Sequence, residues 1–567
     1  MKFSGSLLCV MLCIAAPTFA SAAEDDTKEK SPTADASRQA RLRGSVTPER
    51  AWWDVQHYHL SLQVFPEQKQ IAGSNQITFT VLQPRKRMQI DLQEPLNITS
   101  ITHDSAKLEF EREGNVYWVT FPEELAVATE QQITVAYEGT PTESLRPPWS
   151  GGLTWNKDPE GNHFIATSCQ GIGASIWWPN KDHCYEEPDR GMNISVTVPE
   201  DLTAVCNGRL IKEEADPSEH TKTFHWQVVN PINNYAVNMN IGDYVHFQET
   251  IEAELGPLDM DYWVLRGQKQ TAEEHFREAP RTIEALEHWF GPYPFYEDSY
   301  KLVVVPYLGM EHQSSVTYGN GFKNGYNGKD LSETGVGMKF DFIIVHESGH
   351  EWFGNNITAK DIADMWVQEG FTNYSENLFV NYHFTRTEAE DYVIGCRKRV
   401  NNVEPIIGTY NVNKAGSGDM YYKGGNLLHM IRNVIDNDEK WRSILRGLNH
   451  EFRHSTVTTK QIEDYVSEQA GIDFSSVFDQ YLRGTKIPVF VYSKNENTVS
   501  YHFKDVASDF TVRTKVLVDG KPVWITPTTT PQILSVPSSD STFAVDRNFY
   551  FEIEKTERSD QTAETPS

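Results

Sequence analysis

The chain has 567 residues, of which 39% are hydrophobic and 12% aromatic, and its formal net charge is −28. This length supplies more apolar material than one hydrophobic core can use, so about three domains are expected. The negative charge argues against a nucleic-acid partner, because binding to phosphates requires a basic face. We therefore expect a soluble protein of several globular domains.

The first residues have the order of a secretory signal peptide. Lys2 precedes an apolar run at residues 7–16, and small residues follow at 20–22. We therefore predict a signal peptide at residues 1–22 and an exported protein, either periplasmic or extracellular. An uncleaved anchor is the alternative, but the apolar run is short. No later stretch approaches the ~18 apolar residues of a membrane helix. The charged and small residues at 23–48 predict a flexible tail.

Residues 49–243 alternate between apolar and polar side chains, as Tyr58, Leu60 and Leu62 illustrate. Because a period of two marks a strand with one buried face, we predict an amino-terminal antiparallel β domain. The aromatic run at residues 176–179 within it indicates a core cluster. A sugar-binding surface patch is the alternative.

Helical spacing replaces alternation in residues 244–485. Apolar residues recur three or four positions apart around residues 276–289 and 427–435, which predicts a mostly α-helical domain. Alternation then returns in residues 486–555, and the pattern predicts a small carboxy-terminal β-sandwich followed by a polar tail at 556–567. The predicted fold class is therefore multidomain α+β.

The strongest chemical signal is the pentapeptide His-Glu-Ser-Gly-His that begins at His346. Positions four apart share one face of a helix, so His346 and His350 can reach one metal ion, with Glu347 beside its open side. A second helix, predicted at residues 363–384, would bring Glu369 to the same ion. Two imidazoles, one carboxylate and a water form the open site of a catalytic zinc rather than a closed structural site. The alternative is a pair of histidines buried in a core.

Glu376 lies two helical turns after Glu369 and therefore on the same face of the predicted helix. A carboxylate there could accept the spare N–H of a ligand histidine and fix its tautomer. Asp364 is a weaker candidate for this role. For each of these two acids, a place on the exposed face of an amphipathic helix is the alternative.

These residues resemble the zinc aminopeptidase family of aminopeptidase N and the leukotriene hydrolases, which are gluzincin metallopeptidases. The resemblance covers about residues 53–488 and includes three further motifs. Residues 308–312 resemble the Gly-x-Met-Glu-Asn exopeptidase signature, residues 421–424 the segment with a catalytic tyrosine, and residues 168–170 a segment that holds the substrate's amine. The resemblance implies a thermolysin-like catalytic domain at residues 244–485.

Two positions depart from the exopeptidase signature. Leu308 stands where the family has its first glycine, and His312 stands where it has asparagine. Neither belongs to the metal motif, so the departures affect the expected substrate specificity rather than the reaction type. Family members often carry a large helical domain after this region. The sequence has no segment left for one, so we do not expect leukotriene chemistry.

The resemblance implies a zinc-dependent aminopeptidase with one zinc ion per chain, bound by His346, His350 and Glu369. Zinc-activated water would hydrolyse the first peptide bond, with Glu347 as general base and acid. Tyr421 would donate a hydrogen bond to the oxyanion. The alternative for Tyr421 is an ordinary buried aromatic.

The same resemblance implies that Glu311, with Gln170, Gly309 and Met310, binds the substrate and its α-amine. An amine with a pKa of about 7.7–8.0 is largely protonated at neutral pH, so a carboxylate near the zinc would place the cut after the first residue. We therefore expect peptides with free amino termini as partners, whereas the oligomeric state is not predicted. A zinc endopeptidase with the same site and a catalytically silent binding module are the alternatives.

Four cysteines follow the predicted signal peptide, at Cys169, Cys184, Cys206 and Cys396. An even number in an exported chain permits disulfides, but spacing does not determine their pairing. Cys169, next to Gln170, is also compatible with a buried free thiol.

Overall fold

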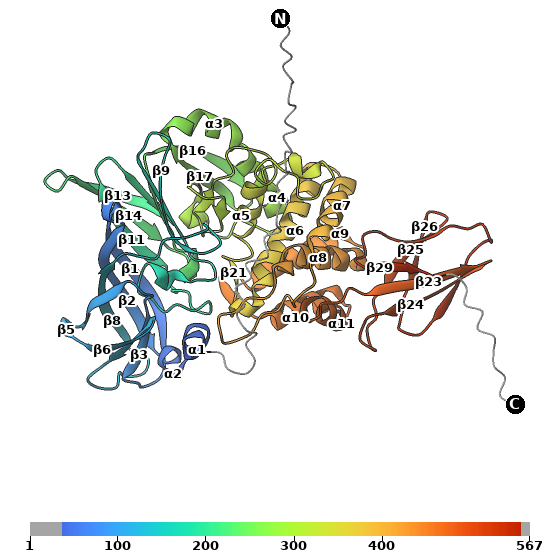
Figure 1. Ribbon diagram of the computed structural model, residues 1–567, viewed down its shortest axis with the longest axis horizontal. Coiled ribbons are helices and arrows are strands. Elements are labelled where there is room, and N and C mark those ends of the chain that lie inside the picture. The colour runs from blue at the N-terminus through green and yellow to red at the C-terminus, as the bar shows by residue number, and fades with distance from the viewer. Residues whose placement is uncertain (1–36, 557–567) are drawn as a thin grey trace, which may run out of the picture. The chain divides into compact units, whose positions relative to one another are not determined.

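The computed structural model describes residues 37–556 (Figure 1). The predicted signal peptide, residues 23–36 of the predicted tail and tail residues 557–567 lie outside the described residues. Between residues 37 and 556, no helix is both long enough and apolar enough to cross a membrane. A β-rich part, a largely helical part and a second β-rich part follow one another along the chain. This order confirms the predicted α+β fold class.

An eight-stranded sheet dominates the amino-terminal part. Its strands, in spatial order, are β13 (Arg209–Asp216), β14 (Thr221–Val228), β11 (Met192–Pro199), β1 (Trp53–Phe65), β2 (Gln70–Val81), β8 (Glu130–Gly139), β4 (Asn97–His103) and β5 (Ala106–Lys107). Neighbouring strands are antiparallel except β1 and β11, which run parallel with Leu60 opposite Ile194. Leu60 and Leu62 are buried and their neighbours are partly exposed. The sequence alternation therefore determines the buried face of the sheet.

Two smaller sheets complete this part, and one of them leads to Gln170. The first contains β12 (Thr203–Cys206), β15 (Met239–Gly242), β10 (His163–Ser168) and β9 (Gly152–Lys157), and the second contains β3 (Arg87–Asp91), β7 (Val116–Thr120) and β6 (Glu109–Glu113). Because β10 ends at Ser168, Gln170 lies just beyond a buried strand. Trp177 and Trp178 are fully buried, so the aromatic run is a core cluster and not a surface patch.

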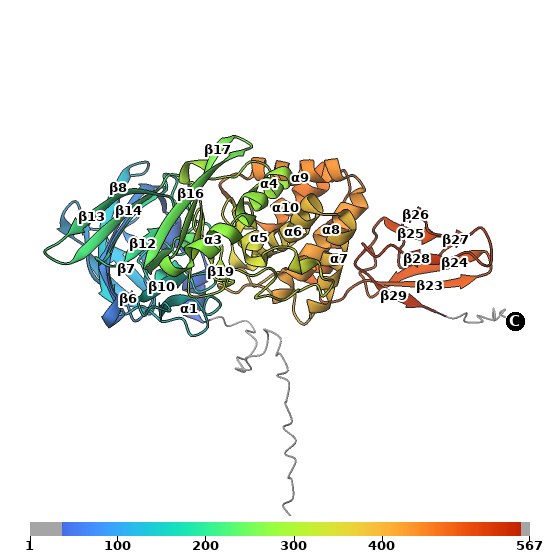
Figure 2. The same ribbon diagram turned by 90° about the horizontal axis from the view of Figure 1, so that it is seen from above.

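The next part combines a mixed sheet with helices. The sheet contains, in spatial order, β16 (Tyr244–Ala253), β17 (Gly256–Leu265), β18 (Tyr300–Val304), β20 (Val316–Tyr318) and β19 (Gly309–Met310). The helices are α3 (Lys269–His275), α4 (Glu278–Phe290), α5 (Phe342–Gly349), α6 (Trp366–His383), α7 (Arg386–Gly395), α8 (Tyr422–Ile435), α9 (Asp438–Glu451), α10 (Thr459–Ala470) and α11 (Ser475–Phe478), and β21 (Ile357–Ala359) pairs with β22 (Ser455–Val457). Helix α6 packs against both α5 and α8 (Figure 1 and Figure 2). The second helix predicted from the sequence corresponds to α6.

Two sheets form the carboxy-terminal part. One contains β27 (Gln532–Ser535), β24 (Thr498–Lys504), β23 (Val489–Asn495) and β29 (Glu552–Lys555), and the other contains β26 (Lys521–Ile525), β25 (Thr514–Val518) and β28 (Phe543–Val545). Phe490 of the first sheet stacks on Phe543 of the second, with ring centroids 6.4 Å apart. Asp519 and Gly520, both with positive φ, form the tight turn between β25 and β26. The predicted small β-sandwich is therefore present.

The chain from Arg38 onward contradicts the prediction of a flexible tail that extends to residue 48. It forms helix α1 (Arg38–Gly44) and helix α2 (Pro48–Ala51). Leu42 of α1 is buried against Val116 and Trp118. Charged composition predicted a solvated segment, but the segment packs on the β domain.

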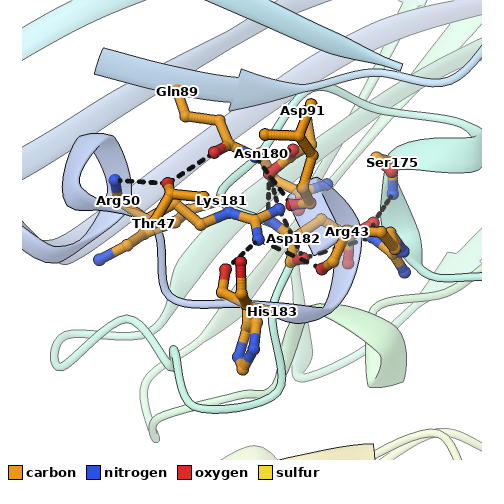
Figure 3. Close-up of polar contacts among 12 residues, drawn as sticks. Arg43, Thr47, Arg50, Gln89, Asp91, Ser175, Asn180, Lys181, Asp182 and His183 are labelled. Carbon is orange, nitrogen blue, oxygen red and sulfur yellow. Dashed lines mark hydrogen bonds and ion pairs between the residues drawn. The ribbon is translucent and has the colours of Figure 1, made fainter. Parts of the chain in front are cut away.

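Two arginines of this segment are bound by aspartates of the β domain (Figure 3). Arg50 is fully buried and donates from Nη2 to Asp91 Oδ2 at 2.7 Å and from Nη1 to Ser45 O at 2.8 Å. Arg43 forms an ion pair with Asp182. These partners lie 41 and 139 positions away along the chain. Local composition therefore carries no sign of the contacts that order the segment.

Replacing Arg50 with methionine should destabilise the amino-terminal part, because it leaves the buried Asp91 carboxylate without its charged partner. Removing one partner of a buried pair costs about 3–5 kcal/mol, so the unfolding temperature measured by calorimetry should fall. Arg38→Ala is the matched control, since the Arg38–Glu113 pair is exposed and such pairs contribute little. Equal unfolding temperatures for the two variants would contradict a stabilising role for Arg50.

Candidate metal centre

Helix α5 brings the two histidines of the pentapeptide together. Asp341 caps the helix by accepting hydrogen bonds from the backbone N–H groups of Ile343 and Ile344. His346 and His350 lie one helical turn further on, and their ring centroids are 5.0 Å apart. Both rings present an Nε2 atom to helix α6.

Glu369 of α6 faces these two nitrogens. Its Oε2 atom lies 3.7 Å from His346 Nε2 and 3.3 Å from His350 Nε2. Among residues 37–556, His350 Nε2 and Glu369 Oε2 are buried atoms without a hydrogen-bond partner. A buried polar atom without a hydrogen-bond partner destabilises the fold unless a ligand or an ion binds it. The ligand atoms of the three residues lie within 4.8 Å of one another, and two imidazoles with one carboxylate are the donors of an open zinc site. The residues therefore fit a zinc ion.

Protein groups hold the other ring nitrogens of both histidines. His346 Nδ1 donates to Glu376 Oε1 at 2.7 Å, and His350 Nδ1 donates to Phe353 O at 2.9 Å. Donation from Nδ1 leaves the lone pair on Nε2, which is the tautomer that a metal ligand needs. The contact with Glu376 agrees with the hypothesis based on its position two turns after Glu369.

Two other residues near this centre differ from the sequence-based expectation. Asp364 does not contact the histidines, because it accepts hydrogen bonds from the hydroxyl groups of Tyr410 and Thr459, both at 2.5 Å. Tyr392 was not predicted, yet its hydroxyl donates to Glu376 Oε2 at 2.6 Å. Tyr392 belongs to α7, so no helical spacing relates it to the metal motif.

Glu347 lies beside the metal cluster. One of its carboxylate oxygens lies within 4.8 Å of ligand atoms of Glu311 and His350. The backbone of Gly309 lies so close to the Glu347 carboxylate that a Cβ atom at position 309 would lie 3.2 Å from Glu347 Oε1. Burial and the nearby carboxylates of Glu369 and Glu376 raise the pKa of Glu347. A buried carboxyl group with a raised pKa is suited to accepting and returning a proton.

Gln170 connects two carboxylates next to the metal cluster. Its Nε2 atom donates to Glu311 Oε1 at 2.5 Å and to Glu369 Oε1 at 2.8 Å. Glu311 follows β19, and Asn355 Nδ2 donates to its backbone oxygen at 3.0 Å. Burial and the nearby carboxylates of Glu369 and Glu347 raise the pKa of Glu311 to about 7. The structure thus brings Gln170 and Glu311 together and adds Asn355, which was not predicted.

Tyr421 directly precedes α8 and faces the metal cluster. Its ring stacks on that of His346, with centroids 6.0 Å apart and an interplanar angle of 22°. Burial and the carboxylates of Glu369 and Glu311 raise the pKa of Tyr421, so the phenol keeps its proton. Tyr422 instead packs against a separate apolar cluster. Of the two tyrosines, Tyr421 is the one placed to donate into the site.

The two departures from the exopeptidase signature add no charge to the site. His312 is fully buried, and its Nδ1 atom lies 3.3 Å from Thr317 Oγ1. Burial lowers the pKa of His312 to about 3, so its ring is neutral. Leu308 is partly buried against the core, and Met310 is buried.

The cysteines do not form disulfides in the described chain. All four, Cys169, Cys184, Cys206 and Cys396, are free thiols. Cys169 is fully buried beside Gln170, and burial raises its pKa. It is therefore a neutral core residue, which was one of the two interpretations of the sequence.

Two family models match the chain. The model described as Peptidase M1 N-terminal domain matches residues 54–235, and the Peptidase family M1 domain matches residues 275–481, together more than half of the chain. The chain belongs to peptidase family M1. The first match contains Gln170, and the second contains the metal cluster, Glu311 and Tyr421. Family M1 membership and the donor set both indicate zinc as the cofactor.

Curated proteins similar to this M1 family member include several aminopeptidases. Glutamyl aminopeptidase of Rattus norvegicus is 24% identical over 477 residues, which cover 79% of this chain and 49% of that protein. Aminopeptidase N of Lactococcus lactis subsp. lactis is 23% identical over 481 residues, which cover 79% of this chain and 52% of that protein. The chain thus spans about half the length of the curated relatives that it matches.

Solved structures of the M1 family share the fold. An M1 zinc metallopeptidase from Deinococcus radiodurans matches with a TM-score of 0.64 at 20% identity, covering 78% of this chain and 95% of that chain. A mutant of it bound to a Tyr-Ser-Ala substrate gives a TM-score of 0.64 at 21% identity, covering 79% and 98%. This likeness concerns the arrangement of helices and strands.

The purified protein should contain one zinc ion per chain, as measured by elemental analysis after gel filtration. His350→Ala should bind zinc far more weakly, because it removes one of three protein donors. His312→Ala is the matched control, since it removes a buried histidine outside the metal cluster and should keep the ion. Equal zinc contents in the His350→Ala and wild-type proteins would contradict the assignment of the cluster.

Proposed function

We propose that this chain is a zinc-dependent aminopeptidase that removes the first residue from peptides with a free amino terminus. The observation that carries the proposal is the contact of Gln170 with both Glu311 and Glu369. The Gln170 amide brings the buried carboxylate of Glu311 next to that of the metal ligand Glu369, where a cationic amine would compensate the negative charge. An endopeptidase binds peptide on both sides of the cut and has no use for such an amine site.

Five side chains would share the chemistry. His346, His350 and Glu369 would hold the zinc ion, which would act as a Lewis acid and lower the pKa of a water molecule. Glu347 accepts a proton during hydrolysis and returns it to the leaving amine. Tyr421 remains protonated and donates a hydrogen bond to the oxyanion that develops on the scissile carbonyl.

Glu311 would determine where the peptide is cut. An α-amine with a pKa of about 7.7–8.0 is mostly cationic at neutral pH and pairs with a carboxylate. Glu311 Oε1 and Glu369 Oε1 are joined by Gln170, so the amine is held next to a metal ligand. With the amine fixed there, the adjacent peptide bond is the one presented for hydrolysis.

Glu347→Gln should keep its zinc but lose on the order of 10²- to 10⁴-fold in turnover of an amino-acid amide, because the amide side chain cannot accept the proton.

Tyr421→Phe should lose on the order of 10²- to 10³-fold in turnover, with little change in KM, because it lacks only the oxyanion donor. Tyr422→Phe is the matched control and should stay close to wild type. If Tyr422→Phe and not Tyr421→Phe lost activity, the assignment of the donor would be wrong.

Acetylating the amino terminus of a peptide should reduce kcat/KM roughly 10- to 100-fold, because a buried carboxylate is left without its cation. Glu311→Ala should cleave free peptides poorly and discriminate less against acetylated ones. Glu311→Gln keeps the shape of the side chain but removes its charge. If the charge binds the amine, this variant should discriminate between free and acetylated peptides no better than Glu311→Ala does.

The rates of cleavage also decide between the proposal and its alternatives. If the wild-type enzyme cleaves free and acetylated peptides at equal rates, the aminopeptidase assignment is wrong and the protein is an endopeptidase. Zinc-loaded protein that cleaves neither peptide, nor any amino-acid amide, would instead be a binding module.

A further inference from the structure

A pocket lies beside the amine-binding residues. Gln170, on the loop after β10, lines this pocket together with Gln368, which directly precedes the metal ligand Glu369. Gln170 also donates to Glu311 and Glu369, the two carboxylates proposed to face the amine of the substrate. The first side chain of a peptide is attached to the carbon atom that carries this amine. The pocket is therefore the space next to the amine that the first side chain can enter.

Apolar side chains from the turn before α6 line part of the pocket. Ile362 is half-buried and Met365 is buried, and both contribute to the lining. Contact with such side chains removes methylene groups from water, which stabilises a bound hydrocarbon chain. This part of the lining favours a substrate side chain with an apolar stem.

Asp361 supplies a carboxylate to the same pocket. It directly precedes Ile362 and is partly exposed. Its Oδ1 atom accepts from the backbone N–H of Ala363 at 3.0 Å, and its Oδ2 atom accepts from the backbone N–H of Asn411 at 2.9 Å. These two bonds fix the position of the carboxylate. Because a carboxylate can accept about four hydrogen bonds, both oxygens can still bind a further donor.

The negative charge of Asp361 is not compensated by a neighbouring cation. Among residues 37–556, Asp361 forms no ion pair, because Arg43, which also lines the pocket, pairs with Asp182 instead (Figure 3). Burial lowers the pKa of His183, another lining residue, to about 3, so its ring is neutral. Burial and the charge of Asp364 raise the pKa of Asp361, which is the direction expected for a carboxylate without a cation beside it.

An apolar lining with an uncompensated carboxylate matches the side chain of lysine or arginine. Both consist of a stem of three or four methylene groups, which can lie along apolar surface, and a cationic end. Asp361 precedes Gln368 by seven residues, which corresponds to a rise on the order of 10 Å along a helical segment. A long side chain is needed to span such a separation from the amine-binding residues.

We propose that Asp361 selects lysine or arginine as the first residue of the substrate by binding the cationic end of its side chain. The proposal rests on the proposed aminopeptidase function and assigns its substrate class. Ile362 and Met365 would contact the methylene stem, while Gln170 and its carboxylate partners bind the amine. Asp361 determines specificity and takes no part in hydrolysis.

The first test compares kcat/KM of the zinc-loaded wild-type enzyme for lysine amide and norleucine amide. Norleucine has the same four-carbon stem as lysine but no charge, so the comparison isolates the cation. Lysine amide should be preferred by about 10-fold or more, the size expected of one hydrogen bond between charged groups. This test needs no variant, so it decides the proposal even if substitutions at position 361 impair folding.

Asp361→Asn is the second test, because it keeps the shape of the side chain and an acceptor for Ala363 but removes the charge. Its kcat/KM for lysine and arginine amides should fall by about 10-fold or more, while the value for norleucine amide should change little. Asp473→Asn is the matched control. Asp473 likewise accepts from the backbone N–H two positions further on, that of Ser475 at 2.8 Å, and does not line the pocket. This control should keep the wild-type ratio of the two amides.

Two results would overturn the proposal. One is a wild-type enzyme that hydrolyses norleucine amide as well as lysine amide, or better. The other is an equal loss on both amides in Asp361→Asn, since a carboxylate that only holds the backbone in place affects all substrates alike. Failure of the proposed function is a different outcome, in which the zinc-loaded wild-type protein hydrolyses no amide at all.

Discussion

The position of Glu369 links the two halves of the candidate site. One oxygen of its carboxylate faces the histidine nitrogens, and the other accepts a hydrogen bond from Gln170 of the β domain. The packing of α6 holds this carboxylate in place, with Phe371 stacked on Phe353 at a centroid distance of 4.3 Å. A displacement of α6 would therefore disturb the metal cluster and the contact between Gln170 and Glu369 together.

The loop that carries Glu311 is held from two parts of the chain. Glu351 Oε1, next to the metal motif, accepts from the backbone N–H of Ser314 at 2.9 Å. From the β domain, Asn207 Nδ2 donates to Gln313 O at 2.7 Å. Buried, satisfied hydrogen bonds of this kind hold a site in one geometry before a ligand arrives. The β domain is thus part of the candidate site.

The pairing of the two histidines and the place of Glu376 could be predicted because their signals are local. Helical periodicity places His350 on the face of His346, and it places Glu376 on the face of Glu369. The contact between Gln170 and Glu311 has no such period, since 141 positions separate the two residues. Only the resemblance to a family of known arrangement indicated it.

The prediction that the flexible tail extends to residue 48 was wrong for a related reason. Composition rules treat a charged segment as solvated, yet Arg43 and Arg50 are ordered by Asp182 and Asp91, which other elements bring to them. Tyr392 escaped prediction in the same way, because α7 meets Glu376 only after the helices pack. Contacts with residues far away in the sequence determine where each of these side chains lies.

Helix α1 couples the amino-terminal end of the described chain to the candidate site. The segment is short and contributes no ligand to the metal cluster, but Arg43 pairs with Asp182 and donates to Ile172 O in the loop that carries Gln170. A Cβ atom on Gly44 would lie 1.9 Å from the backbone nitrogen of Asn413, in the segment before Tyr421. The placement of residues next to the site thus depends on a segment that supplies no chemical group to it.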